Sequence, residues 1–300
     1  MMTWSGVFPA VTTKIGAGGA VDLKATQASI ERLVSSGVSG IIVLPMLGEN
    51  AALTQSERDS VVVAAREVVA GRVPLLSGLA ELSSESAATA ARNYRRLGAE
   101  GLMVFPSLAY RTDVRETVAW YKAVAGASDL PIMIYNNPLA YRVDVDIPTL
   151  SALADVPNIV CIKEESGDIR RVTDLYNAFG DRFAVFCGVD DLILESLALG
   201  VTGWVSGMTN AWPAECVELF NGGRAGRFDA ARSLYRIMTP AFHLDTSVKL
   251  VQYIKLAEHL VYGASAAVRP PRLELDDDER RMVEAVVRLT IEALKRRSAA

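Results

Sequence analysis

Residues 183–206 read FAVFCGVDDLILESLALGVTGWVS, and this stretch decides the fold class. The apolar run Phe183 to Cys187 is typical of a buried strand, and Gly203 to Ser206 is a second run of that kind. Between them, Asp190 to Leu199 places apolar residues at i, i+3 and i+4, as a helix does. A strand, a helix and a strand in succession predict two parallel strands joined by a crossover helix.

The same alternation fills most of the chain. Apolar runs that predict strands are Val7 to Thr12, Gly40 to Pro45, Val73 to Leu79, Gly101 to Pro106, Pro131 to Asn136, Ile159 to Lys163, Phe183 to Cys187 and Gly203 to Ser206. The helical pattern covers Asp22 to Ser36, Thr54 to Ala70, Ser83 to Leu97, Thr112 to Ala127, Ile147 to Ala154, Asp168 to Phe179 and Asp190 to Leu199. Eight apolar strands that alternate with helices predict an α/β protein with a closed (β/α)8 barrel, a TIM barrel.

Helical pattern without strands continues from about Pro213 to the end, in Arg227 to Leu244, Ser247 to Val261 and Asp277 to Arg297. We therefore expect a catalytic barrel over residues 1–222 and a C-terminal helical extension over residues 223–300. Such an appended bundle is expected to serve oligomerisation.

Composition excludes several function classes. The chain has 35 acidic and 31 basic residues, and the basic ones are scattered, which argues against nucleic acid as a partner. Neither a signal peptide nor a run of about 18 apolar residues is visible, so we expect no membrane partner and a cytoplasmic location.

The three cysteines suggest neither a disulfide framework nor a zinc site. Both histidines, His243 and His259, fall in the helical extension, which excludes a Ser-His triad or a histidine-rich metal site in the barrel. No metal or cofactor is expected.

Lys163 is the residue that stands out chemically. It ends the apolar run that starts at Ile159, and a lysine is rarely buried unless it is paired or used. Burial disfavours the ammonium form and leaves a free amine that can attack a carbonyl or imine carbon. Two other interpretations stay open: a structural ion pair with Glu165, or a lysine that reaches the solvent at the rim.

Other strand ends converge on the same rim, because barrel sites form where the strands end. Tyr135 is a candidate for proton transfer, or a rim tyrosine bonded to the backbone. The Gly48-Glu49 turn is a candidate for holding a carboxylate by free backbone N–H groups, with Glu49 fastening the loop, or it is a plain turn. Gly188 either lets a ligand approach the backbone or makes a tight turn.

The sequence resembles the dihydrodipicolinate synthase and N-acetylneuraminate lyase family of class I aldolases. The resemblance covers nearly the whole chain, and it is carried by residues 6–13 (GVFPAVTT), 48–54 (GENAALT), 135–138 (YNNP), 162–164 (IKE) and 188–191 (GVDD). It implies that Lys163 is the Schiff-base lysine, that Tyr135 transfers protons, and that the backbone N–H of Leu47 helps to hold the substrate carboxylate. The main chain at Gly188 and Val205 would complete the pocket, and a dimer of dimers is the implied assembly.

Several positions depart from the family pattern. Met46 and Leu47 stand where members usually carry two small hydroxyl residues, so the hydroxyl proton relay is missing. The synthase places an arginine five residues after its tyrosine, where this chain has Ala140, with Arg142 two residues further on. The tyrosine expected after Pro106 is Leu108, although Tyr110 could approach. These departures argue against condensation with aspartate semialdehyde.

A subgroup resemblance gives the most specific expectation. The stretches that look like those of 1-pyrroline-4-hydroxy-2-carboxylate deaminases of hydroxyproline catabolism are residues 4–13, 135–138 with 141–142, 195–197 with 203–208, and 269–273. That resemblance implies ammonia release from a cyclic imino acid, with 2,5-dioxopentanoate as the other product.

Three alternatives stay open. The chain could be a dihydrodipicolinate synthase or another pyruvate or 2-oxo-acid aldolase, because the same lysine serves them all. It could also be a sugar-acid dehydratase. A non-catalytic sensor that binds a 2-oxo acid is a further alternative, although such a protein needs neither a nucleophile nor a proton shuttle.

Overall fold

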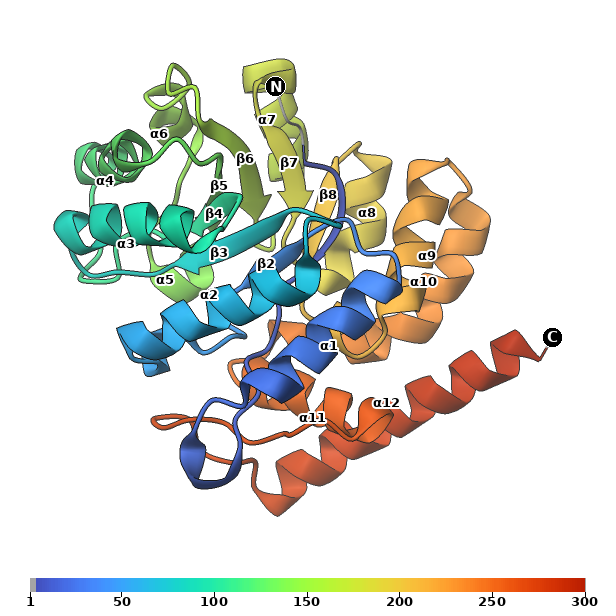
Figure 1. The fold of residues 1–300 in the computed structure, drawn as a ribbon. Coiled ribbons are helices and arrows are strands. Elements are labelled where there is room, and N and C mark those ends of the chain that lie inside the picture. The colour runs from blue at the N-terminus through green and yellow to red at the C-terminus, as the bar shows by residue number, and fades with distance from the viewer. Residues whose placement is uncertain (1–3, 300) are drawn as a thin grey trace.

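The computed structural model describes residues 4–299, and its centre is one eight-stranded parallel sheet (Figure 1). The strand order is β1-β8-β7-β6-β5-β4-β3-β2, and a parallel bridge between Ala10 and Ile42 brings the two edges together. The predicted barrel is confirmed. Its strands are β1 (Gly6–Pro9), β2 (Ile41–Val43), β3 (Leu75–Leu79), β4 (Gly101–Val104), β5 (Ile132–Asn136), β6 (Ile159–Glu164), β7 (Ala184–Cys187) and β8 (Gly203–Ser206).

Helices connect the strands and cover the outside of the barrel (Figure 1). These are α1 (Leu23–Ser35), α2 (Gln55–Val69), α3 (Ser84–Leu97), α4 (Val114–Ala127), α5 (Pro138–Tyr141), α6 (Ile147–Ser151), α7 (Arg170–Phe179) and α8 (Ile193–Ala198). The capping box predicted at Thr54 and Glu57 is present: the Thr54 side chain accepts from the Glu57 N–H, and the Glu57 carboxylate accepts from the Thr54 N–H. The sequence pattern missed α5, a single turn that begins at Pro138.

Four further helices follow the last strand: α9 (Pro213–Arg224), α10 (Phe228–Phe242), α11 (Leu250–Tyr262) and α12 (Asp277–Ser298). The boundary predicted between residues 222 and 223 lies within α9, and that division of the chain stays a prediction. Single 3-10 turns are η1 (Ala17–Gly19), η2 (Asn50–Ala52), η3 (Gly180–Arg182), η4 (Asp190–Leu192), η5 (Met208–Asn210) and η6 (His243–Thr246).

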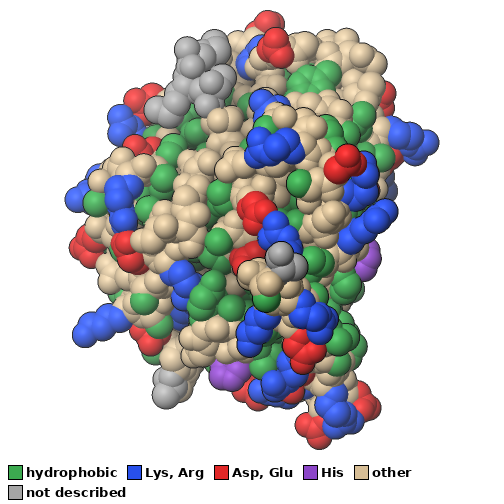
Figure 2. All heavy atoms as spheres, turned by 90° about the vertical axis from the view of Figure 1, so that its right-hand side faces the viewer, with side chains coloured by type: hydrophobic (Ala, Val, Ile, Leu, Met, Phe, Trp, Pro, Cys, Tyr) green, Lys and Arg blue, Asp and Glu red, His purple; other side chains and the backbone are tan. Residues whose placement is uncertain are grey.

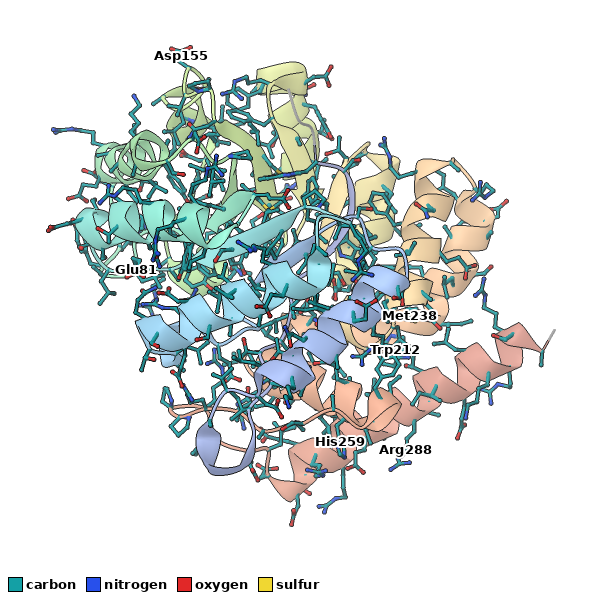
Figure 3. The ribbon with its side chains drawn as sticks, viewed as in Figure 1. Glu81, Asp155, Trp212, Met238, His259 and Arg288 are labelled. Atoms are coloured by element: carbon teal, nitrogen blue, oxygen red, sulfur yellow. The ribbon has the colours of Figure 1, made fainter. Side chains whose placement is uncertain are left out.

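The extension lies at the carboxyl ends of the strands. Figure 3 places Asp155, which precedes β6, at the opposite end of the molecule from His259 of α11. Turn η6 contacts η4, which follows β7, and α11 contacts η5, which follows β8. Residues of the extension therefore border the end of the barrel at which active sites form in this fold.

A buried ion pair joins the extension to the barrel. The Lys255 ammonium of α11 contacts the Glu49 carboxylate, and both side chains are 0 % exposed. The second Glu49 oxygen accepts from the Arg269 N–H at 2.8 Å, and Lys255 also donates to the Ala267 carbonyl oxygen at 2.8 Å. Glu49 thus fastens the loop after β2 to two segments of the extension.

Lys255→Met should lower the free energy of unfolding by about 3 to 5 kcal/mol, because it leaves the Glu49 carboxylate buried without its cation. Urea unfolding measures the loss, with Lys295→Met as the control at an exposed lysine. Adding Glu49→Gln to Lys255→Met should recover part of the loss. A single variant as stable as wild type would show that the pair does not hold the extension.

The outer surface carries both signs of charge. Figure 2 shows Lys and Arg interspersed with Asp and Glu over the face that it presents. No helix in the described part of the chain is long and apolar enough to cross a membrane.

Candidate active site

Lys163 lies near the end of β6 and is 6 % exposed. Its register partners are Tyr135 on β5 and Phe186 on β7. The lysine Nζ lies 2.5 Å from Glu165 Oε2 and 3.9 Å from the centroid of the Tyr135 ring. The ion pair with Glu165 considered from the sequence therefore exists, and it stands inside a pocket rather than at the solvent-exposed rim.

Gly188 makes room for the lysine side chain. A Cβ atom at this position would lie 2.9 Å from Lys163 Cε and 2.8 Å from Glu165 Cβ. Any larger residue would displace one of these side chains, so the glycine is needed for close approach rather than for a turn with positive φ.

Two other lysines of the described chain, Lys14 and Lys255, are also buried. Burial lowers the pKa of each amine, but each is held by a carboxylate. Lys14 Nζ lies 2.5 Å from Glu258 Oε1, and Lys255 contacts Glu49. Neither lines the pocket, so Lys163 is the buried lysine that a ligand there can reach.

Tyr135 and Glu165 are linked through one amide. The Asn137 side chain donates from Nδ2 to Glu165 Oε1 at 2.9 Å and to the Tyr135 hydroxyl at 3.2 Å. Its orientation is fixed because Oδ1 accepts from the Ala140 N–H at 2.9 Å, as the N-cap of α5. The result is a connected path from the lysine amine through Glu165 and Asn137 to the phenol.

Burial raises the pKa of Tyr135 well above its usual value, and the nearby Glu165 carboxylate adds to the rise. The phenol is therefore protonated at neutral pH and able to donate. Phe105 and Tyr141 pack edge-on against its ring, with centroids 4.9 and 5.5 Å away. These contacts fix the ring with its face toward the Lys163 amine.

The loop after β2 forms another wall of the pocket. Asn50 donates from Nδ2 to the carbonyl oxygen of Leu44 at 3.0 Å, and Thr13 donates to that of Gly48 at 2.8 Å. Within residues 4–299, the backbone N–H groups of Met46 and Leu47 have no hydrogen-bond acceptor. They face no competing partner and are available to a carboxylate.

The expectation that Gly48 and Glu49 supply free N–H groups is wrong. The Gly48 N–H donates to the Pro45 carbonyl at 3.1 Å, and the Glu49 N–H donates to that of Met46 at 2.9 Å. The chain turns tightly here, and the turn uses both groups. The free donors are therefore one and two residues earlier than the Gly-Glu pair indicated.

The predicted site residues divide into three groups. Those that line the inner pocket are Met46, Leu47, Tyr135, Lys163, Gly188 and Val205. Glu49 and Ala140 line a cavity of about 880 Å³ that adjoins the inner pocket and shares Met46, Glu165, Asp245 and Leu250 with it. Gly48, Tyr110 and Arg142 line neither.

Tyr110 and Arg142 are both exposed. The Tyr110 hydroxyl donates to Glu116 at 2.9 Å, and Arg142 caps the end of α5 with a φ of 60°. In the described chain neither side chain supplies a polar group to the pocket.

Among the lining residues that sequence reasoning missed are Tyr141, Asp245 and Arg272. Tyr141 and Arg272 fall within stretches that carried the subgroup resemblance, but no pattern marked them as lining residues. Asp245 had no local signal, because it lies in the helical extension. Only the packing of η6 over the strand ends brings it to the pocket.

The fold and the site define a barrel enzyme with a lysine nucleophile candidate, and comparison with known proteins defines the family. The model of the dihydrodipicolinate synthetase family matches residues 3–290. The 4-hydroxy-tetrahydrodipicolinate synthase of Exiguobacterium sibiricum is 34% identical over 273 residues, which cover 91% of this chain and 92% of the relative.

Solved structures agree with this assignment. The 4-hydroxy-tetrahydrodipicolinate synthase of Methylacidiphilum fumariolicum SolV has a TM-score of 0.93 at 25% identity and covers 97% of each chain. YagE of E. coli K12, solved in complex with pyruvate, has a TM-score of 0.91 at 26% identity over 96% of this chain and 99% of its own. The chain belongs to the dihydrodipicolinate synthetase family, and it is a class I lyase of that family.

Proposed function

We propose that the chain deaminates 1-pyrroline-4-hydroxy-2-carboxylate to 2,5-dioxopentanoate and ammonia through an imine on Lys163. The observation that carries this proposal is the composition of the pocket wall. The positions that would hold a hydroxyl relay are Met46 and Leu47, and the position that would hold a carboxylate-binding arginine is Ala140. Apolar side chains at these three positions favour one compact ring with a single carboxylate, because a second carboxylate placed beside them would have no cation there.

The first steps follow from the positions of the groups. The substrate carboxylate would accept hydrogen bonds from the free Leu47 and Met46 N–H groups, which places C2 of the ring toward the lysine. Lys163 Nζ adds to C2, the bond from C2 to the ring nitrogen breaks, and an iminium ion links the opened chain to the enzyme. The lysine must lose a proton before it adds, and Glu165 Oε2 is 2.5 Å away to take it.

Loss of the 4-hydroxyl group as water then gives an unsaturated iminium ion, and proton shifts turn the C5 amine into an enamine. Water hydrolyses this enamine to an aldehyde and ammonia, and hydrolysis of the iminium ion frees Lys163. Tyr135 donates and accepts protons in the hydrolytic steps, because it lines the pocket beside Lys163 and Asn137 holds its hydroxyl near Glu165.

A second candidate function is condensation of pyruvate with an anionic aldehyde, as the names of the synthase relatives suggest. One observation favours it. Arg272 lines the outer cavity and its nearest carboxylate is Glu49, with 4.0 Å between Nη1 and Oε2. Glu49 already has Lys255 and the Arg269 N–H as partners, so Arg272 retains charge for a second carboxylate. The absence of an arginine at Ala140 therefore does not leave the cavity without a cation.

We further propose a homo-oligomer in the cytoplasm that binds only small molecules. The oligomeric proposal rests on the family. One solved relative is described as the first monomeric dihydrodipicolinate synthase variant, a description that makes a monomer the exception. Light scattering of the purified chain measures the assembly directly.

A direct comparison of the two reactions tests the proposed function. Purified protein should release ammonia from 1-pyrroline-4-hydroxy-2-carboxylate on the order of 10²-fold faster than it condenses pyruvate with aspartate semialdehyde, because Ala140, Met46 and Leu47 supply neither the arginine nor the hydroxyl groups that condensation uses. Boiled protein is the control for the instability of the cyclic imine. Efficient condensation without ammonia release would establish the second candidate instead.

A further inference from the structure

Asp245 is a carboxyl group of the pocket to which the steps above give no role. It lies in η6 of the helical extension and lines both the inner pocket, with Lys163, and the outer cavity. A glycine brings it over the end of β8: a Cβ at Gly207 would lie 2.5 Å from Asp245 Oδ1. The Asp245 carboxyl therefore reaches into the pocket over Gly207, the residue after β8, where a side chain would block it.

The segment that carries Asp245 is held in place on both sides. Before it, His243 Nδ1 lies 2.7 Å from Asp191 Oδ2, in the loop after β7. After it, the Thr246 hydroxyl donates to the His243 carbonyl at 2.9 Å, and the Ser247 N–H donates to the Leu244 carbonyl at 3.4 Å. These contacts hold the segment that carries the Asp245 carboxyl.

The charged groups that act on Asp245 are Asp190, Glu165 and Lys163, and the other two acids have partners. Asp190 accepts from Trp204 Nε1 at 2.9 Å and from the Met208 N–H at 2.7 Å, one bond to each oxygen. Glu165 holds Lys163 and Asn137. Within residues 4–299, the hydrogen bond that the Asp245 carboxyl receives comes from the Asp190 backbone N–H, whereas the Asp190 carboxyl receives one at each oxygen.

Asp190 has more hydrogen-bond donors than Asp245, so of these two carboxyl groups Asp245 holds its proton more tightly. Removal from solvent raises the pKa of Asp245 well above its usual value, and the carboxylates of Asp190 and Glu165 raise it further, more than Lys163 lowers it. Protonated Asp245 thus stands near the Glu165 carboxylate, which is paired with Lys163. Such an arrangement divides acid and base roles between two carboxyl groups.

We propose that Asp245 is the general acid that protonates the leaving group of the Lys163-bound intermediate. The inference rests on the proposed function, in which the leaving group is the hydroxyl on C4. In the iminium ion the C3–H bond breaks, its proton goes to a base such as Glu165, and its electron pair forms the C2=C3 bond of an enamine. That pair then forms the C3=C4 bond as the C4–O bond breaks, and the Asp245 proton joins the departing oxygen, which leaves as water. Asp245 is left as a carboxylate and regains a proton from solvent.

Asp245→Asn tests this role, because it keeps the size of the side chain and removes the acidic proton. Ammonia release from 1-pyrroline-4-hydroxy-2-carboxylate should fall about 10²-fold to 10⁴-fold. Borohydride added during turnover should trap an adduct that keeps the C4 hydroxyl and is therefore heavier by one water than the adduct formed after elimination. Asp229→Asn, at a fully exposed aspartate on α10, is the matched control and should match wild type.

Exchange of the pyruvate methyl protons for deuterium is a second measurement. This exchange requires the imine on Lys163 and a base, but no acid, because pyruvate has no leaving group. The Asp245→Asn variant should exchange the methyl protons of pyruvate for deuterium at the wild-type rate, which also shows that it is folded. Equal loss of exchange and ammonia release would overturn the proposal, as would ammonia release within about threefold of wild type. If wild type releases no ammonia, the proposed function fails and the inference with it. If wild type releases ammonia and the Asp245→Asn variant releases it equally fast, only the inference about Asp245 fails.

Discussion

Lys163→Ala should abolish both covalent capture of pyruvate and turnover, with a loss on the order of 10⁴-fold or more, because no other group can replace the nucleophile. Lys14 and Lys255 are buried and paired with a carboxylate as Lys163 is, but both lie outside the pocket. The rate of ammonia release from 1-pyrroline-4-hydroxy-2-carboxylate measures the effect.

The matched control is Lys295→Ala, at an exposed lysine on α12, which should retain full activity. Circular dichroism should show that Lys163→Ala is folded, because the substitution leaves Glu165 with its Asn137 contact and access to solvent at the pocket. A Lys163→Ala variant that keeps one tenth of wild-type turnover would contradict the assignment of this lysine.

Tyr135→Phe should lower turnover by about 10²-fold to 10⁴-fold while imine formation with pyruvate persists, because one positioned proton donor is lost and the lysine is unchanged. The ring itself stays packed against Phe105 and Tyr141, so the fold should be preserved. Steady-state rates and the yield of borohydride-trapped adduct, measured on the same preparation, separate the two effects.

A control for loss of a tyrosine hydroxyl is Tyr176→Phe. Its hydroxyl donates to the Gly200 carbonyl at 2.9 Å, and Tyr176 lines neither the inner pocket nor the outer cavity. A Tyr135→Phe enzyme with more than a third of wild-type turnover would assign the proton transfers to another group, with Tyr141 the nearest hydroxyl in the same aromatic cluster.

The fold could be predicted from the local spacing of apolar residues. Each strand of the barrel must be apolar on both faces, and each covering helix must be apolar on one. The runs that predict strands begin or end within a few residues of those observed, and Gly203–Ser206 agrees at both ends. Short α5 escaped detection because one turn is too brief to show a helical period.

The site residues that could be predicted are those that interrupt an apolar sequence pattern. Lys163 was visible because a lysine ends an apolar strand, and Tyr135 because it ends the neighbouring one. Asp245 and Arg272 were not, because their place beside the lysine depends on how the extension folds back over the barrel rather than on any local spacing. The Leu47 donor was expected from the family resemblance, whereas the local pattern pointed to Gly48 and Glu49, because the hydrogen bonds of a tight turn cannot be read from a Gly-Glu pair.

The most direct test of the central claim is peptide mapping after reduction with borohydride in the presence of pyruvate. Trypsin does not cleave after a modified lysine, so an adduct on Lys163 should appear on one peptide that spans residues 143–170, with the cleavage after Lys163 missing. Peptides that contain Lys14 and Lys255 should keep their unmodified masses. An adduct at either of those lysines, or a protein of unchanged mass, would contradict the account.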